Sequence, residues 1–375
     1  MKLPRMSAPR RALAALAILA SAVFSWGAAL DPNLSANLTL PSPPPAKPSA
    51  PAAAKTSLTI VWPTPNPAFM KGGDLASWAQ DTGTGDPHSG LFGCVRDSGH
   101  KFHEGIDIKC MERDKKGNPL DAVSAVMDGE VVYINSAAAN GDYGRYIVLE
   151  HPHADVPVYT LYAHLAAIAP GLKTGQSVTA GDMIGTLGHS GTEKIPLDRA
   201  HLHFEIGLRL SSDFQFYYDA EKLPGKNEHG NYNGFNLIGS DPQAFFEKVR
   251  AGKFKNFADY IKAIPTAFTL RVTTSRVPDF AARYPALLSR PAGLDGVAGW
   301  DIAFTWYGMP KELTPLPPGT PGLGDAGAIA LVSYDRAQFT GCTCRDTLLF
   351  GTGKNPTPKL GKYIADNIKM MFHFK

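Results

Sequence analysis

The sequence has 375 residues, of which 44% are hydrophobic and 19% charged, as in an ordinary globular protein. This length exceeds what one hydrophobic core needs, so two domains with non-globular ends are expected. The formal net charge of +3 becomes −1 (3 − 4) without residues 1–29, which hold four basic and no acidic residues. The remaining chain therefore has no basic excess that would indicate a nucleic-acid partner.

The N-terminus is typical of a secretory leader. A basic start precedes an uncharged apolar run at 12–24, and Gly27-Ala28-Ala29 offers small residues for cleavage. The pattern predicts a signal peptide over 1–29 and export to the cell envelope, either periplasmic or extracellular. The run is too short for a permanent anchor, so we expect no stable membrane span after its removal. Residues 30–56 are rich in Pro and Ala and predict an extended linker.

Residues 57–250 predict a mainly β domain. Alternating or β-branched stretches favour strands at 58–62, 146–150, 158–162 and 201–206, and Asp128-Gly129 between Val126 and Val131 favours a hairpin. Helical periodicity appears only at 241–263. We therefore expect an antiparallel sheet whose long loops form an open cleft.

Residues 251–375 predict a smaller α+β accessory domain. Apolar residues alternate at 268–272 and 302–306, and helices are expected at 279–288 and 359–371. This region contains no motif that carries chemistry.

Because export is predicted, we expect the four cysteines to lie in an oxidising compartment, where disulfides form. Cys94 and Cys110 are close in sequence and are favoured as a pair on that ground alone. A bond between Cys342 and Cys344 would be strained because one residue separates them. Four cysteines allow three connectivities, and all stay open.

The densest polar pattern is a His-x3-Asp sequence at 103–107 followed by a His-x-His sequence at 201–203. Residues i and i+2 of a strand share a face, so His201 and His203 point the same way. Gly105 lets the chain bend between His103 and Asp107. Zinc accepts imidazole and carboxylate together, and three protein ligands leave a fourth position open, which is the catalytic pattern.

Other polar residues compete for a role. His151 and His153 follow a predicted strand and are interpreted as strand-end or loop residues, and His189 as a turn residue near the cleft. Glu205 shares the predicted face of His201 and His203, so it is expected to hold a ligand imidazole rather than act as a base. Solvent-facing packing is the alternative for Glu205, and His151 and His153 could instead take the place of His164.

An ordered series of motifs resembles the lysostaphin/LytM-type zinc peptidases of bacterial cell walls over residues 58–250. The matching segments are 102–108, 128–132, 143–151, 161–165, 175–185 and 201–206. The resemblance implies one Zn²⁺ per chain bound by His103, Asp107 and His203, with His164 and His201 as unligated catalytic histidines. Segments 63–92 and 192–200 depart from the family pattern and are expected to form cleft walls.

The resemblance further implies an exported endopeptidase that hydrolyses peptide bonds in the stem or cross-link peptides of peptidoglycan. Two alternatives remain. One is a non-catalytic envelope protein that binds the wall or activates another hydrolase. The other is a latent enzyme in which the linker or residues 63–92 cover the open metal position.

Overall fold

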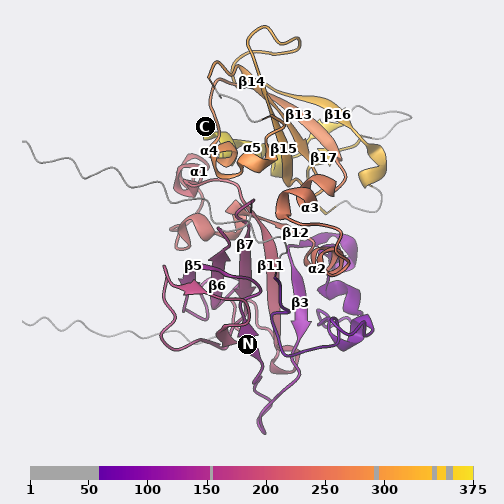
Figure 1. Ribbon diagram of the computed structural model, residues 1–375, viewed down its shortest axis with the longest axis vertical. Coiled ribbons are helices and arrows are strands. Elements are labelled where there is room, and N and C mark those ends of the chain that lie inside the picture. Colours follow the sequence, from indigo (N-terminus) through magenta and orange to yellow (C-terminus); the bar gives the residue numbers. More distant parts are fainter. Residues whose placement is uncertain (1–58, 153–154, 291–294, 340–343, 352–357, 375) are drawn as a thin grey trace, which may run out of the picture. The chain divides into compact units, whose positions relative to one another are not determined.

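The computed structural model describes residues 59–374 except 153–154, 291–294, 340–343 and 352–357. The predicted signal peptide and the whole of the predicted linker lie outside these residues. Most of the regular structure is antiparallel sheet, as the sequence predicts (Figure 1).

The main sheet carries Asp107 and the His-x-His motif. Its hydrogen-bonded order is β12 (Leu237–Ser240), β11 (His201–Arg209), β7 (Tyr159–Ala163), β6 (Tyr146–Glu150), β5 (Gly129–Asn135) and β9 (Ser177–Val178), and β3 (Ile106–Lys109) also pairs with β11. The strands predicted at 146–150, 158–162 and 201–206 are thereby confirmed. All of these pairs are antiparallel.

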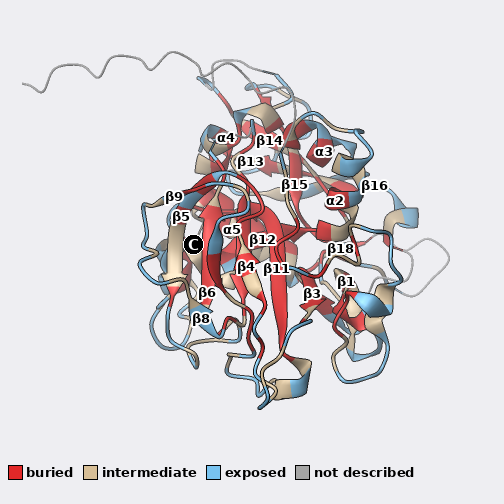
Figure 2. Cartoon of the chain, turned by 60° about the horizontal axis from the view of Figure 1, so that its bottom comes forward, coloured by how far each residue is buried: buried red, intermediate tan, exposed pale blue. Residues whose placement is uncertain are grey.

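Strand β11 is buried along almost its whole length, as Figure 2 shows. One face places Leu202, Phe204 and Ile206 in the hydrophobic core. The opposite face carries His201, His203 and, one step further, Glu205, since successive side chains alternate between faces. The β11 backbone thus joins the core to a row of buried polar groups.

The predicted hairpin at Asp128-Gly129 does not form. Strand β4 (Ala122–Ser124) pairs with β10 (Met183–Thr186), which also pairs with β8 (Ala167–Ile168), whereas β5 belongs to the main sheet. The Asp128 carboxylate instead accepts a hydrogen bond from the amide of Ala180 at 2.9 Å. The turn therefore transfers the chain between two sheets, because long-range pairing outweighs the local turn preference.

Residues 59–62 do not form the predicted strand. Trp62 instead packs with Phe69, Trp78 and Phe246, with ring centroids 4.5, 5.9 and 5.0 Å away. The side chain of Asn66 donates to the carbonyl of Lys109 at 3.4 Å, next to β3. The segment 63–92, expected to form a cleft wall, thus contributes an aromatic cluster to the core.

The helical signal at 241–263 corresponds to two short helices, α2 (Pro242–Arg250) and α3 (Phe257–Ala263). Asp241 caps α2 by accepting from the amide of Ala244, and Asn256 caps α3 by accepting from the amide of Asp259. Between them Gly252 has φ = +65°, a left-handed conformation that ends a helix.

The C-terminal region has its own sheet in the order β15 (Pro310–Leu316), β14 (Gly299–Phe304), β13 (Phe268–Thr273) and β16 (Ile329–Tyr334). This region also contains helices α4 (Asp279–Arg283) and α5 (Lys362–Phe372) and the strand pair β17 (Leu348–Leu349) and β18 (Lys359–Leu360). Helix α1 (Phe214–Ala220) comes earlier in the chain, after β11. The α+β prediction is confirmed. Residues 55–375 cluster as one unit, and the boundary at 250 stays a prediction.

A disulfide joins the two regions, and it is not the predicted one. Cys94, on β1 (Gly93–Arg96), bonds to Cys344 across 250 residues of sequence, with 5.6 Å between Cα atoms. Cys110 is buried without a disulfide among the described cysteines, and Cys342 lies outside the described residues. Proximity failed as a guide because β1 pairs with β2 (Lys101–His103), while Cys110 follows β3 in the main sheet.

In the described part of the chain, no helix combines the length and apolar character needed to cross a bilayer.

Candidate metal centre

The three predicted metal ligands come together through strand pairing. In the β3–β11 register Asp107 lies opposite His203, so the two side chains share a sheet face. The chain between β2 and β3 brings His103 beside them. Gly105 permits this approach, because a Cβ there would lie 2.2 Å from the carbonyl oxygen of Phe204.

The ligand atoms form a nearly equilateral triangle. His103 Nε2 lies 3.0 Å from His203 Nδ1 and 3.2 Å from Asp107 Oδ1, and the remaining edge, His203 Nδ1 to Asp107 Oδ1, is 3.1 Å. Zinc bonds of 2.0–2.1 Å in tetrahedral geometry require ligand separations of about 3.3 Å. The buried triangle could therefore hold a zinc ion with little rearrangement.

The outer nitrogens of both ligand imidazoles have fixed partners. His103 Nδ1 is 2.7 Å from the carbonyl oxygen of Leu91, and His203 Nε2 is 2.9 Å from Glu205 Oε1. In the neutral ring each outer nitrogen donates to its acceptor, which leaves the inner nitrogen with a lone pair that faces the triangle. The expected contact between Glu205 and a ligand imidazole is present.

Glu205 is itself held by two tyrosines. Its carboxylate accepts from the hydroxyls of Tyr143, at 2.5 Å, and Tyr159, at 2.7 Å. Burial alone would raise the pKa of Glu205, but the bonds from His203 and the tyrosines lower it. A charged Glu205 then keeps His203 oriented, because an ionised acceptor makes the stronger hydrogen bond.

His164 and His201 lie beside the triangle, with ring centroids 4.9 Å apart. His164 Nδ1 donates to the carbonyl of Ser190 and His201 Nδ1 to that of Arg199, each at 2.8 Å. Both therefore present an unprotonated Nε2, and His201 Nε2 is 3.5 Å from Asp107 Oδ1. His164 holds a positive φ of 60°, a strained conformation for a non-glycine residue.

The pKa shifts differ among the three candidate ligands and the two further histidines. Burial lowers the pKa of His103 and His201, and it lowers that of His164 well below the usual value together with the charges of His201 and His203. Burial would also lower the pKa of His203, but hydrogen bonds and charges from Asp107 and Glu205 raise it to about 9. For Asp107, burial opposes ionisation, yet the neighbouring His103, His201 and Arg96 hold its pKa well below the usual range.

The competing histidines have other surroundings. His151 is buried, with Nδ1 2.9 Å from the Asp128 carbonyl oxygen and Nε2 2.8 Å from Thr160 Oγ1. His189 is exposed and its Nδ1 donates to the Ile195 carbonyl at 3.0 Å. Neither belongs to the histidine cluster, and His153 lies outside the described residues.

Sequence reasoning missed one charged residue at the centre. Arg96, on β1, places Nη2 2.8 Å from His103 Nε2 and hydrogen-bonds Asp107 Oδ2. No spacing rule connects it to the histidines. The roles of Tyr143 and Tyr159 were also missed, although Tyr143 begins one of the matching motifs.

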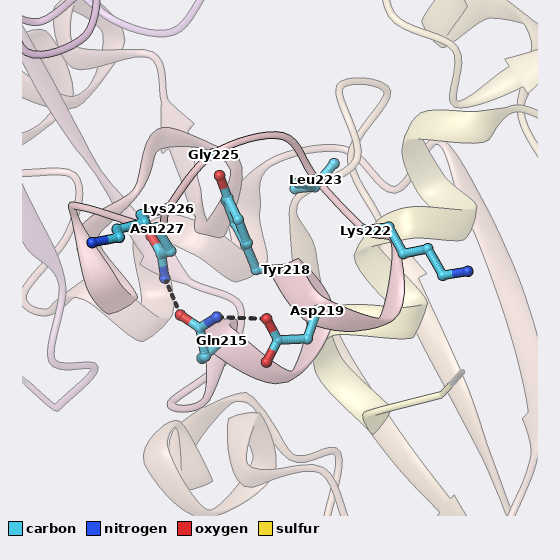
Figure 3. Close-up of a pocket in the computed structure, with 8 residues that line it drawn as sticks. All are labelled: Gln215, Tyr218, Asp219, Lys222, Leu223, Gly225, Lys226 and Asn227. Atoms are coloured by element: carbon cyan, nitrogen blue, oxygen red, sulfur yellow. Dashed lines mark hydrogen bonds between the residues drawn. The ribbon is translucent and has the colours of Figure 1, made fainter.

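Two of the cavities in the described part of the chain differ in how close they lie to the triangle. One, of about 810 Å³, is lined by Glu104 and Tyr143 near the ligands and by Arg345, Lys362 and Asp366 from the C-terminal region. The other, of about 520 Å³, is lined by residues 215–227, and its Gln215 bonds Asp219 and Asn227 (Figure 3). Only the first adjoins residues of the metal centre.

Comparison with known proteins finds a family match for the part of the chain that contains the metal centre. Residues 101–212 match the model of peptidase family M23. No curated protein matches the chain significantly.

Solved structures add similar sequences. A zinc containing peptidase from Vibrio cholerae is 30% identical over 28% of this chain and 26% of that chain (TM-score 0.22). A putative glycyl-glycine endopeptidase lytM from Ruminococcus gnavus is 31% identical over 28% and 39%, respectively (TM-score 0.23). The catalytic domain of lysostaphin from Staphylococcus simulans is 21% identical over 46% and 95% (TM-score 0.28). The chain thus spans well under half the length of the first two.

The family match includes Asp107 and all four histidines of the cluster. The resemblance found in the sequence is confirmed, since residues 101–212 match the model of peptidase family M23.

Proposed function

We propose that this chain is an exported, zinc-dependent endopeptidase that hydrolyses peptide bonds in the peptide part of peptidoglycan. The observation that supports it best is the buried His103–Asp107–His203 triangle with two further imidazoles beside it, within a peptidase-family segment. The predicted leader supports export, and the resemblance to wall-acting peptidases supports the substrate class.

The donor set fits zinc. Two imidazole nitrogens and one carboxylate oxygen match the metal's ligand preference, and the three separations are close to those of a tetrahedral site. A zinc ion bound there would polarise a substrate carbonyl and lower the pKa of bound water towards about 7.

The two further histidines would manage protons. His201 and His164 each have Nδ1 fixed by a backbone carbonyl, so Nε2 is available to accept a proton from the attacking water. Their lowered pKa values keep both rings neutral near pH 7, the state that a general base needs. After attack, a protonated ring could stabilise the developing charge or donate to the leaving amine.

The test is digestion of purified peptidoglycan from several wall types, with products identified by mass. Replacing His201 by Ala should reduce the cleavage rate by about 10²–10⁴-fold while the bound zinc stays at one ion per chain. The matched control is His189→Ala, which removes an exposed histidine outside the cluster.

Two outcomes count against the proposal. Undiminished cleavage by the His201→Ala protein would reject the catalytic assignment. A wild-type protein that binds no zinc and cuts no wall would favour the alternative of a non-catalytic envelope protein.

A further inference from the structure

Arg96 occupies a position that the proposed zinc chemistry does not explain. It ends β1, which pairs with β2, and the register places it opposite Lys101 and close in space to His103. Its side chain is only 23% exposed. Its guanidinium lies against two of the three proposed ligands rather than in solvent.

While His103 Nε2 accepts a hydrogen bond from Arg96, the same nitrogen cannot bind a metal ion. His103 Nδ1 carries the proton that it donates to the Leu91 carbonyl, so Nε2 has a single lone pair. A guanidinium has donors and no acceptor, and Arg96 Nη2 is 2.8 Å from that Nε2. One lone pair cannot accept from Arg96 and also bind a cation.

The contact with Asp107 does not have this conflict. Arg96 bonds Oδ2, whereas Oδ1 is the oxygen that faces His103 and His203. Arg96 could therefore stay on Oδ2 while its contact with His103 breaks. A guanidinium beside a divalent cation would still repel it, since like charges at this range disfavour each other.

A further observation indicates that this arrangement is not fully satisfied. Arg96 Nε is buried and has no hydrogen-bond partner among the described residues. Buried polar nitrogens in native proteins nearly always have a partner. The arginine thus leaves one donor unpaired in order to lie against the ligands.

The backbone that carries Arg96 is fixed. Cys94, two residues away, is bonded to Cys344. The neighbouring Arg345 is 2.9 Å from the Glu104 carboxylate and lies over the Phe102 ring, 3.7 Å from its centroid. Removal of Arg96 from the triangle therefore requires rotation of its side chain rather than movement of β1.

We propose that Arg96 competes with zinc for His103 Nε2 and so sets the metal concentration at which the site fills. This inference rests on the metal site proposed above. The guanidinium lies against His103 Nε2 and Asp107 Oδ2, next to the position that a bound cation would take. Zinc must displace it from His103 before the triangle is complete.

The test compares zinc affinity in Arg96→Met and wild-type protein, by competition with a chromophoric chelator of known affinity. Met keeps much of the side-chain volume but cannot donate a hydrogen bond. We expect zinc to bind at least about ten-fold more tightly to Arg96→Met. The matched control is Lys101→Met, which removes the same charge from the same hairpin; Lys101 contacts Glu193 instead, at 3.6 Å.

Arg96→Gln provides a second variant and should shift affinity in the same direction, with folding of each protein checked by circular dichroism. Unchanged or weaker zinc binding in both Arg96 variants would overturn the competition, since it would mean that Arg96 is neutral or supports the ligands. Equal tightening by Lys101→Met would also overturn it, by reducing the effect to general charge. Absence of zinc binding in every protein would instead reject the proposed function itself.

Discussion

In strands β11 and β13 successive side chains alternate between the two faces, but the side chains that the two strands bury differ in kind. In β13, Phe268, Leu270 and Val272 are buried and the residues between them are half-buried, including Arg271, which pairs with Asp301 across the strands at 2.7 Å. In β11 both faces are buried, so imidazoles and a carboxylate lie inside the protein.

The difference shows what a buried polar face requires. Three buried polar side chains of β11, His201, His203 and Glu205, each have at least one partner within hydrogen-bond distance. Such a row is stable only when its members are paired, because an unpaired buried polar group costs about 1–3 kcal/mol. Strand β13 meets no such demand, since the buried side chains on its inner face are hydrophobic.

The largest expected effect tests whether the two regions depend on each other. Replacing Cys94 and Cys344 by Ser should lower the free energy of unfolding by about 5 kcal/mol, because the bond closes a loop of 250 residues in the unfolded chain. Urea unfolding followed by circular dichroism measures it. Cys110→Ser is the control, and an equal loss there would mean that the bond itself contributes little.

The next effect concerns a buried histidine near the end of β6. Burial lowers the pKa of His151 from 6.5 to about 4. The unfolded chain therefore binds the proton more readily between these values, and stability is lost as the pH falls from about 6.5 towards 4. The expected loss is on the order of 3 kcal/mol.

Urea unfolding at pH 7 and pH 4, with a chelator present to exclude metal release, measures this loss. His151→Gln should lose that much less between the two pH values than the wild type. Parallel losses in the two proteins would show that His151 does not titrate differently in the folded state.

The smallest effect tests the polar face of β11 directly. Glu205→Gln keeps the shape but removes the charge that holds His203, so zinc affinity should fall by about 10–100-fold. Chelator competition measures it. Leu270→Ala is the contrasting variant: it should lower stability by about 3 kcal/mol and leave zinc affinity unchanged. If both weaken zinc equally, affinity follows overall stability and the distinction between the two sheets fails.

Sequence patterns were reliable where the chemistry is local. Strand alternation placed His201 and His203 on one face, and the main strands at 146–150 and 201–206 formed as expected. Local turn and proximity rules failed at Asp128-Gly129 and at Cys94, because pairing between distant strands decided both outcomes. The helix predicted over 279–288 ends at Arg283 and continues as a short 3₁₀ turn from Pro285, since Pro cannot donate within a helix.

The alternative of a latent enzyme can be tested only by trimming the linker. A truncation that removed residues 63–92 together with the linker would take Phe69 and Trp78 out of the core, so a truncation that tests a covering linker should end before residue 59. Residues 63–92 do reach the centre, but through the Leu91 carbonyl that fixes His103.

By itself the sequence determined which residues could bind a metal, because His-x3-Asp and His-x-His carry their ligand types and one shared strand face. Only the tertiary structure decided which nitrogen of each ring faces the centre. Those choices depend on the carbonyls of Leu91, Ser190 and Arg199 and on the Glu205 carboxylate. The tertiary structure also brought Arg96 to His103, a contact that depends on the β1–β2 pairing and that no residue spacing encodes.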